Sequence, residues 1–116
     1  AGYTSVGPHR ADWASRFTVI PGRDALSRGQ AKLTALVCLL AQAEDYAEQR
    51  GEWPVIALDD LASELDRRHQ ELVLDRLSRS PAQIFITATE PLPALENLAG
   101  ISRFHVEHGR IAPLHP

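Results

Sequence analysis

Apolar residues occur along this chain in two patterns, helical spacing and short unbroken runs, which follow one another in turn. From Ser27 they return every three or four residues until Gly51, which predicts a long helix with one apolar face. Residues 55–58 form a short unbroken apolar run, as expected of a strand buried on both faces. Residues 83–87 form a second apolar strand, and helical spacing over 65–77 lies between the two. This order predicts a right-handed crossover between parallel strands and an α/β fold.

The two ends of the chain differ from this centre. Residues 1–15 show no clear period and are expected to be irregular, whereas 16–20 are an expected strand stopped by Pro-Gly. After the second apolar strand, two prolines predict a short helix or loop as far as Leu98. Apolar and polar residues then alternate over 104–111, around a His-Gly turn, which predicts a closing hairpin.

Composition places the chain among ordinary compact domains. Of its 116 residues, 44% are hydrophobic and 23% are charged, which suits one core. No apolar run could cross a bilayer and no signal-peptide layout is seen, so we expect a cytoplasmic protein with no membrane partner. Cys38 is the single cysteine, which excludes a disulfide framework within this chain. The formal net charge of -3 gives no sign of an extended basic surface for nucleic acid. Any contact with DNA must therefore be confined to a small part of this chain or be made by another part of the protein.

The start of the long helix carries the first candidate for chemistry. The segment consists of Leu26, Ser27, Arg28, Gly29 and Gln30. Ser27 with Gln30 is a capping-box pattern, which by itself only satisfies backbone N–H groups. The same helix start offers unpaired N–H groups, the positive end of a dipole, a glycine and a hydroxyl, which together suit a terminal phosphate. Both interpretations stay open at this point.

Two aspartates follow the first apolar strand. Asp59 and Asp60 are expected at its carboxyl end, the ligand-binding edge of open α/β sheets, in an arrangement that resembles a Walker B motif. Asp59 would then hold Mg²⁺, and Asp60 would be the catalytic residue that orients or deprotonates the attacking water. The alternative is that both residues cap or flank the next helix.

The third motif completes a pattern that resembles a known family. Ser63 and Asp66 belong to a Ser-Glu-Leu-Asp element at the distance of the D-loop in ABC-type ATPases. The Leu-Ser-Arg-Gly-Gln segment, the apolar run into Asp-Asp and this element, in that order, resemble the RecF family. Residues 7–12 (Gly-Pro-His-Arg-Ala-Asp) and 104–111 match further stretches of that family. The resemblance therefore covers nearly the whole chain.

The resemblance implies a fold and a reaction. Residues 1–116 would be the C-terminal part of an ABC-type ATPase head, with a parallel sheet core, flanking helices and a C-terminal hairpin. The implied cofactors are ATP and Mg²⁺. The full-length protein would hydrolyse ATP slowly and form an ATP-dependent homodimer, in which residues 26–30 contact the partner's nucleotide and Ser63 and Asp66 lie at the interface.

The resemblance also implies a biological role in DNA replication, recombination, repair and the SOS response. The full-length protein would bind single- and double-stranded DNA at gaps. It would act there with RecR to assist the loading of RecA.

Some parts of the ATPase pattern differ or are missing. Where ABC transporters carry a phosphate-contacting histidine, this chain offers Thr87 and Thr89 as candidate phosphate sensors. His9 and Arg10 are candidates for phosphate or partner contacts, or else form a turn. The chain has no Gly-x-x-x-x-Gly-Lys-Ser/Thr P-loop and no methionine, which suggests a piece of a larger protein. We expect such a piece, lacking the P-loop lobe, neither to bind nor to hydrolyse ATP alone.

Two other functions fit part of the pattern. An SMC-like ATPase head shares the order of the motifs but requires long heptad segments elsewhere in the protein. A degenerate ATPase lobe could instead serve only as a non-catalytic interaction module, which would bind its partners without nucleotide.

Overall fold

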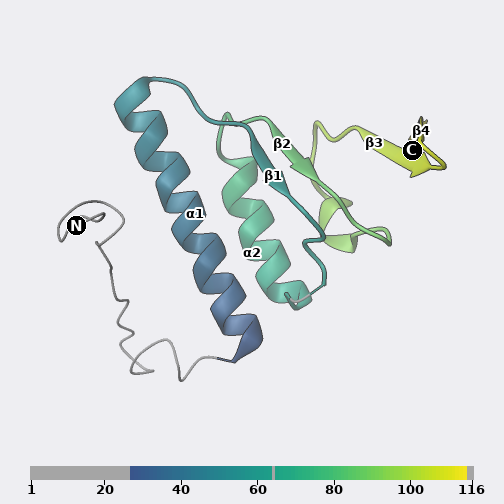
Figure 1. The fold of residues 1–116 in the computed structure, drawn as a ribbon, viewed down its shortest axis with the longest axis horizontal. Coiled ribbons are helices and arrows are strands. Elements are labelled where there is room, and N and C mark those ends of the chain that lie inside the picture. Colours follow the sequence, from purple (N-terminus) through teal and green to yellow (C-terminus); the bar gives the residue numbers. More distant parts are fainter. Residues whose placement is uncertain (1–26, 64, 115–116) are drawn as a thin grey trace, which may run out of the picture.

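The computed structural model describes residues 27–63 and 65–114, which form two helices, two small sheets and a short 3-10 helix (Figure 1). The elements are α1 (Arg28–Arg50), β1 (Ile56–Leu58), α2 (Arg67–Ser78), β2 (Ile84–Ile86), η3 (Pro93–Leu95), β3 (Arg103–Glu107) and β4 (Arg110–Leu114). The expected α/β class is confirmed. The strand expected over 16–20 and the candidates His9, Arg10 and Leu26 lie outside the described residues.

Helix α1 has the bounds that the sequence predicts. It begins directly after Ser27 and ends at Gly51, whose φ of 75° is the left-handed conformation that glycine adopts without strain. The Gly51 N–H donates to the carbonyl of Ala47 at 2.9 Å and closes the last turn. Three leucines from one face of the helix pack against the core: Leu33, Leu36 and Leu40. Among the described residues, α1 and α2 are too short or too polar to cross a membrane.

Strands β1 and β2 form a parallel pair, as the strand–helix–strand pattern predicts. Ile56 pairs with Ile84 and Leu58 with Ile86, and the chain passes through α2 between the two strands. The Thr87 N–H donates to the carbonyl of Leu58 at 3.0 Å and continues the pairing beyond the last residue of β2. The ends of both strands therefore lie at one edge.

The expectation that the strand over 55–58 is buried on both faces is wrong for the described residues, and β2 shows the same pattern. Ile56, Leu58 and their partners on β2 pack against the core, but the alternate positions face outward. Phe85 is 55% exposed and Val55, just before β1, is 61% exposed. An apolar run shows that both faces can be buried, but the described helices pack against only one of them.

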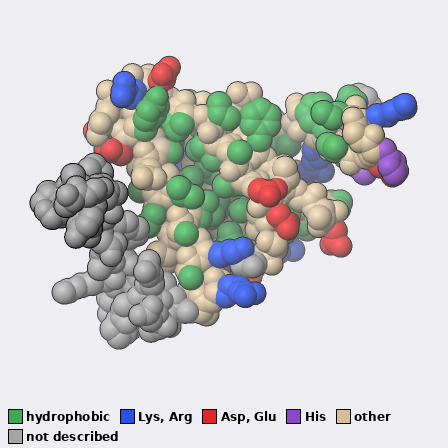
Figure 2. Space-filling model, in the orientation of Figure 1, with side chains coloured by type: hydrophobic (Ala, Val, Ile, Leu, Met, Phe, Trp, Pro, Cys, Tyr) green, Lys and Arg blue, Asp and Glu red, His purple; other side chains and the backbone are tan. Residues whose placement is uncertain are grey.

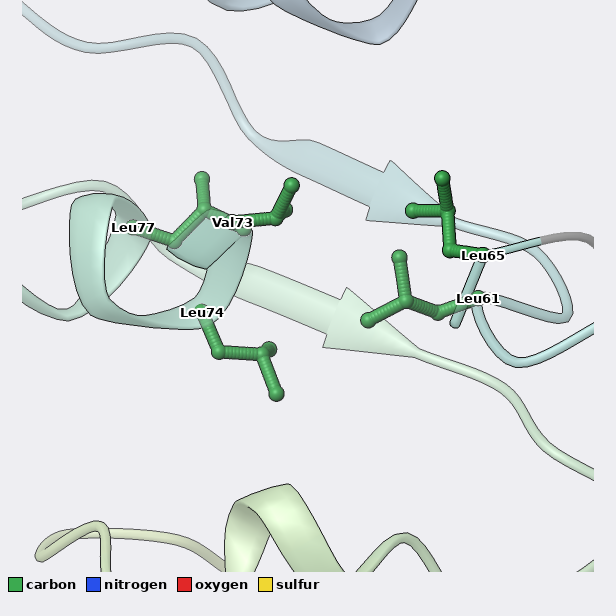
Figure 3. Packing of buried hydrophobic residues seen from close by; sticks show 5 residues of the cluster. All are labelled: Leu61, Leu65, Val73, Leu74 and Leu77. Atoms are coloured by element: carbon green, nitrogen blue, oxygen red, sulfur yellow. The ribbon is translucent and has the colours of Figure 1, made fainter. Parts of the chain in front are cut away.

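The core gathers around α2 and the loop before it. Five side chains form the buried cluster, shown in Figure 3: Leu61, Leu65, Val73, Leu74 and Leu77. Leu65 was expected on the helix itself, but α2 begins only at Arg67. The buried Gln70 side chain donates to the Leu65 carbonyl at 2.7 Å, so the polar group is paired and the loop is held against the helix.

Strands β3 and β4 form the expected antiparallel hairpin, which projects from the body of the fold (Figure 1). His108 and Gly109 form its turn with φ of 48° and 72°, the positive values of a type I′ hairpin turn. Phe104 pairs with Pro113 and Val106 with Ile111, so one face is apolar. Hydrophobic side chains gather on the hairpin in Figure 2, and all of its strand residues are exposed.

Candidate functional site

The candidate residues lie toward one end of the fold. In Figure 1 the two helices run in the opposite direction to β1 and β2, so the helix N-termini and the strand carboxyl ends lie toward the same end. Ligands of open α/β sheets bind at such strand ends. The described candidates found there include Ser27, Asp59, Asp60, Asp66 and Thr87.

Thr87 joins the ends of the two parallel strands through its hydroxyl group. The hydroxyl donates to Asp59 Oδ1 at 2.5 Å and accepts the backbone N–H of Asp60 at 3.0 Å. The structure thus brings together two predicted acids and one predicted phosphate sensor. The contact itself was not predicted, although adjacent parallel strand ends are the signal that could have found it.

Asp60 has an unusual backbone conformation. Its φ of 51° lies in the left-handed region, which aspartate visits more readily than most residues other than glycine. The Ser63 N–H donates to the Asp60 carbonyl at 3.1 Å, which closes a turn directly after β1. Both backbone polar groups of Asp60 are therefore bonded, the N–H to the Thr87 hydroxyl and the carbonyl to the Ser63 N–H.

The cap of α2 is Asp66 and not one of the two earlier aspartates, so the capping alternative for Asp59 and Asp60 is wrong. Asp66 Oδ1 accepts the backbone N–H of His69 at 2.9 Å, and His69 Nδ1 lies 2.9 Å from the same oxygen. The backbone hydrogen bond from His69 is the main cause that holds the pKa of Asp66 below its usual value of 3.8; desolvation opposes it, and the His69 side chain and Arg68 add to it. Asp66 therefore has a structural role besides any role at an interface.

The start of α1 shows the full capping box. The Gln30 N–H donates to Ser27 Oγ at 3.2 Å, and the Ser27 N–H donates to Gln30 Oε1 at 2.9 Å. The amides of Arg28 and Gly29 have no acceptor within the helix, because first-turn N–H groups lack a carbonyl four residues earlier. The cap thus satisfies two donors and leaves two at the helix end.

The candidate acids suit a cation that arrives with a nucleotide. Within residues 27–63 and 65–114, no three or more histidine, cysteine, aspartate or glutamate side chains form a metal-binding group. Mg²⁺ commonly takes one or two carboxylates and completes its shell with phosphate oxygens and water. Asp59, the predicted Mg²⁺ ligand, fits that demand. The second candidate sensor, Thr89, is exposed, and its side chain makes no hydrogen bond to a described residue.

The strand-end residues do not line the groove that the described part of the chain forms elsewhere. That groove, of about 550 Å³, lies between α1 and the segment over 54–58, and its lining includes Leu39, Tyr46 and Val55. None of the candidate residues belongs to it. Asp59 is exposed and Asp60 is half-buried, and both lie outside this groove.

Comparison with known proteins gives a consistent family. The chain is 78% identical over 111 residues to the DNA replication and repair protein RecF of Stenotrophomonas maltophilia, and 70% identical over 112 residues to that of Xanthomonas axonopodis pv. citri. The RecF protein of Shewanella loihica is 43% identical over 113 residues. No family model and no solved structure matches the chain.

These matches cover nearly all of this chain but only part of each relative. Each covers 96% of this chain but only 30% or 31% of the relative, so the chain spans about a third of the length of the curated relatives. Such a share is consistent with the expected C-terminal segment of a longer protein. The chain belongs to the RecF family.

Proposed function

We propose that residues 1–116 are the C-terminal part of the ABC-type ATPase head of a RecF-type DNA repair protein, in which the chain contributes half of each nucleotide site. Its relatives are named DNA replication and repair proteins and are about three times as long. The outward faces of Phe85 and of the hairpin support the proposal, because further protein can cover them. Identity of 78% to RecF favours this family over an SMC-like head.

The observation that carries the proposal is the pair of aspartates at the shared edge of two parallel strands. Asp59 would hold Mg²⁺ together with the nucleotide phosphates, and Asp60 would orient or deprotonate the attacking water. When bound, Mg²⁺ would neutralise charge on the phosphate oxygens. The P-loop that cradles the phosphates would come from elsewhere in the full-length protein, since this chain has none.

The start of α1 would serve the second nucleotide of an ATP-dependent homodimer. The Arg28 and Gly29 amides and the Ser27 hydroxyl would meet the terminal phosphate held by the partner's P-loop. Ser63 and Asp66 would lie at the same interface. In this state the full-length protein, in the cytoplasm, would bind single- and double-stranded DNA at gaps and assist RecA loading together with RecR.

The test is Asp60→Asn in the full-length protein, where the amide keeps the shape but removes the basic carboxylate. We expect ATP turnover to fall by roughly 10²–10⁴-fold, as on the loss of a general base, while the ATP-bound dimer persists. Turnover is measured by phosphate release, and dimerisation by light scattering with ATP and Mg²⁺. Asp75→Asn is the matched control, since this exposed aspartate on α2 pairs only with Arg79.

A non-catalytic interaction module is the alternative function, and the uncovered hairpin favours it. Val106 and Ile111 are 66% and 71% exposed, which suits a surface that meets another protein. Unchanged turnover in the Asp60→Asn protein would contradict the catalytic assignment. Partner binding that is independent of nucleotide, in a wild-type protein without turnover, would establish the interaction module.

A further inference from the structure

We propose that Thr87 is a positioning residue that holds Asp59 and the Asp60 backbone in place, and that it does not contact the terminal phosphate. The inference rests on the proposed function for the role of the two aspartates. It assigns Thr87 a different task from Thr89, although both residues follow β2 and both carry hydroxyl groups.

The hydrogen-bonding capacity of one hydroxyl decides between the two tasks. A threonine hydroxyl has a single hydrogen to donate and two lone pairs to accept with. In Thr87 the hydrogen is donated to Asp59 Oδ1 at 2.5 Å, and one lone pair accepts the Asp60 N–H at 3.0 Å. What remains is a lone pair, which a phosphate oxygen cannot use. Thr87 could contact phosphate only by giving up its bond to Asp59.

The same contacts suit a positioning role. The Thr87 backbone N–H donates to the Leu58 carbonyl at 3.0 Å, so the hydroxyl is anchored by the strand pairing itself. It bonds to Oδ1 of Asp59, and Asp59 Oδ2, which makes no hydrogen bond to a described residue, would be open to a cation. It also holds the N–H of Asp60, whose φ of 51° is a conformation that needs support from its surroundings. One side chain thereby connects both acids to the neighbouring strand.

Hydrogen bonds to a metal-binding side chain orient it and thereby affect the affinity of the site for the metal. Removing such a partner lowers metal affinity by about 10–100-fold in known metal sites. Thr87→Val replaces the hydroxyl with a methyl group of nearly the same size and keeps the branched shape that suits a strand end. We therefore expect its main effect on the Mg²⁺ requirement.

The experiment is a Mg²⁺ titration of ATP-dependent dimerisation in the full-length protein, followed by light scattering. We expect Thr87→Val to raise the half-maximal Mg²⁺ concentration by about 10–100-fold. Thr87→Ser keeps the hydroxyl and is expected to restore most of the wild-type behaviour. The matched control is Thr34→Val, which removes a hydroxyl that bonds only to the Gln30 carbonyl of its own helix.

Melting curves from circular dichroism establish that each variant is folded before it is titrated. If Thr87→Val proves unstable, Thr87→Ala removes the hydroxyl without adding a methyl group to the loop. A wild-type Mg²⁺ midpoint in a folded variant without the hydroxyl overturns the inference. So does a loss of ATP affinity at saturating Mg²⁺, because that result indicates a direct phosphate contact.

Asp59→Asn separates this inference from the proposed function. A raised Mg²⁺ midpoint for Asp59→Asn but not for Thr87→Val leaves the function standing and overturns only the role of Thr87. If neither variant changes the midpoint, the assignment of the strand-end acids fails, and the inference fails with it. Raised midpoints in both, with rescue by Thr87→Ser, support both conclusions.

Discussion

A carboxylate in front of a helix stabilises it by accepting its first N–H groups, and Asp66 does so for α2. Its Oδ1 accepts the His69 N–H and lies next to the His69 ring nitrogen. These contacts favour the ionised form, so the pKa of Asp66 lies below 3.8 in the folded state. Because the folded pKa is lowered, the stabilisation is complete above the unfolded pKa and is lost as the pH falls through the folded pKa.

This linkage predicts a pH-dependent effect of one substitution. We expect Asp66→Ala to lower the free energy of unfolding at pH 7 and to have much less effect at a pH below the lowered pKa, where the wild-type carboxyl is neutral. Asp66→Asn keeps an oxygen that can accept the cap hydrogen bond, so its free energy of unfolding at pH 7 should lie between those of the wild type and Asp66→Ala. Chemical unfolding followed by circular dichroism at both pH values measures the difference. An equal loss at both pH values would show that the charge of Asp66 is unimportant.

The hydrogen bonds of single residues could be predicted where the bonding partner is close in sequence. Ser27 and Gln30 are three residues apart, and their reciprocal bonds are those that the capping-box pattern predicts. Thr87 and Asp59 are 28 residues apart, and only the pairing of β1 with β2 brings them together. The capping role of Asp66 was missed because three aspartates precede α2 and sequence alone does not select one.

Helix α1 illustrates how one element can combine a stabilising cap with a proposed contact. Ser27→Arg removes the cap, at a cost of about 0.5–2 kcal/mol, which a helix of 23 residues packed on the core should tolerate. It also places bulk and charge at the proposed dimer interface. We expect a folded monomer that no longer dimerises with ATP.

Ser27→Asp is the control that separates these two effects. Aspartate is as good a cap as serine, so helix stability should be kept, but its charge would repel a terminal phosphate. Light scattering of the full-length protein with ATP and Mg²⁺ measures dimerisation. Normal dimerisation of both variants would count against the placement of Ser27 at the interface.

Local sequence patterns predicted whether a segment is a helix or a strand more reliably than they predicted which of its faces is buried. Period-three-and-four spacing predicted α1, and alternation around His108-Gly109 predicted the hairpin, because both depend on residues close in sequence. Which faces of β1 and β2 are covered depends on where the helices pack. Phe85 is 55% exposed, although it belongs to an apolar run, because the described helices pack against the other face of β2.

At the scale of the whole molecule, a small cluster around α2 joins the two helices and the parallel strands. Leu74 is 3% exposed within this cluster, so Leu74→Ala should lower the free energy of unfolding by about 2–5 kcal/mol. Leu72 on the same helix is 57% exposed, and its replacement by alanine should change stability by about 0.5 kcal/mol or less. Urea unfolding of the two variants makes the comparison. Similar losses in both would contradict the placement of the core.

The sequence by itself determined the family, the order of the central elements, the capping box and the acids after the first strand, because each depends on residue types at short spacings. Only the tertiary structure decided that Thr87 bonds to Asp59, that Asp66 caps α2 and that the described helices leave one face of the parallel strands uncovered. These facts depend on which distant segments pack together. Packing depends on the shape and burial of many side chains at once, which no local pattern encodes.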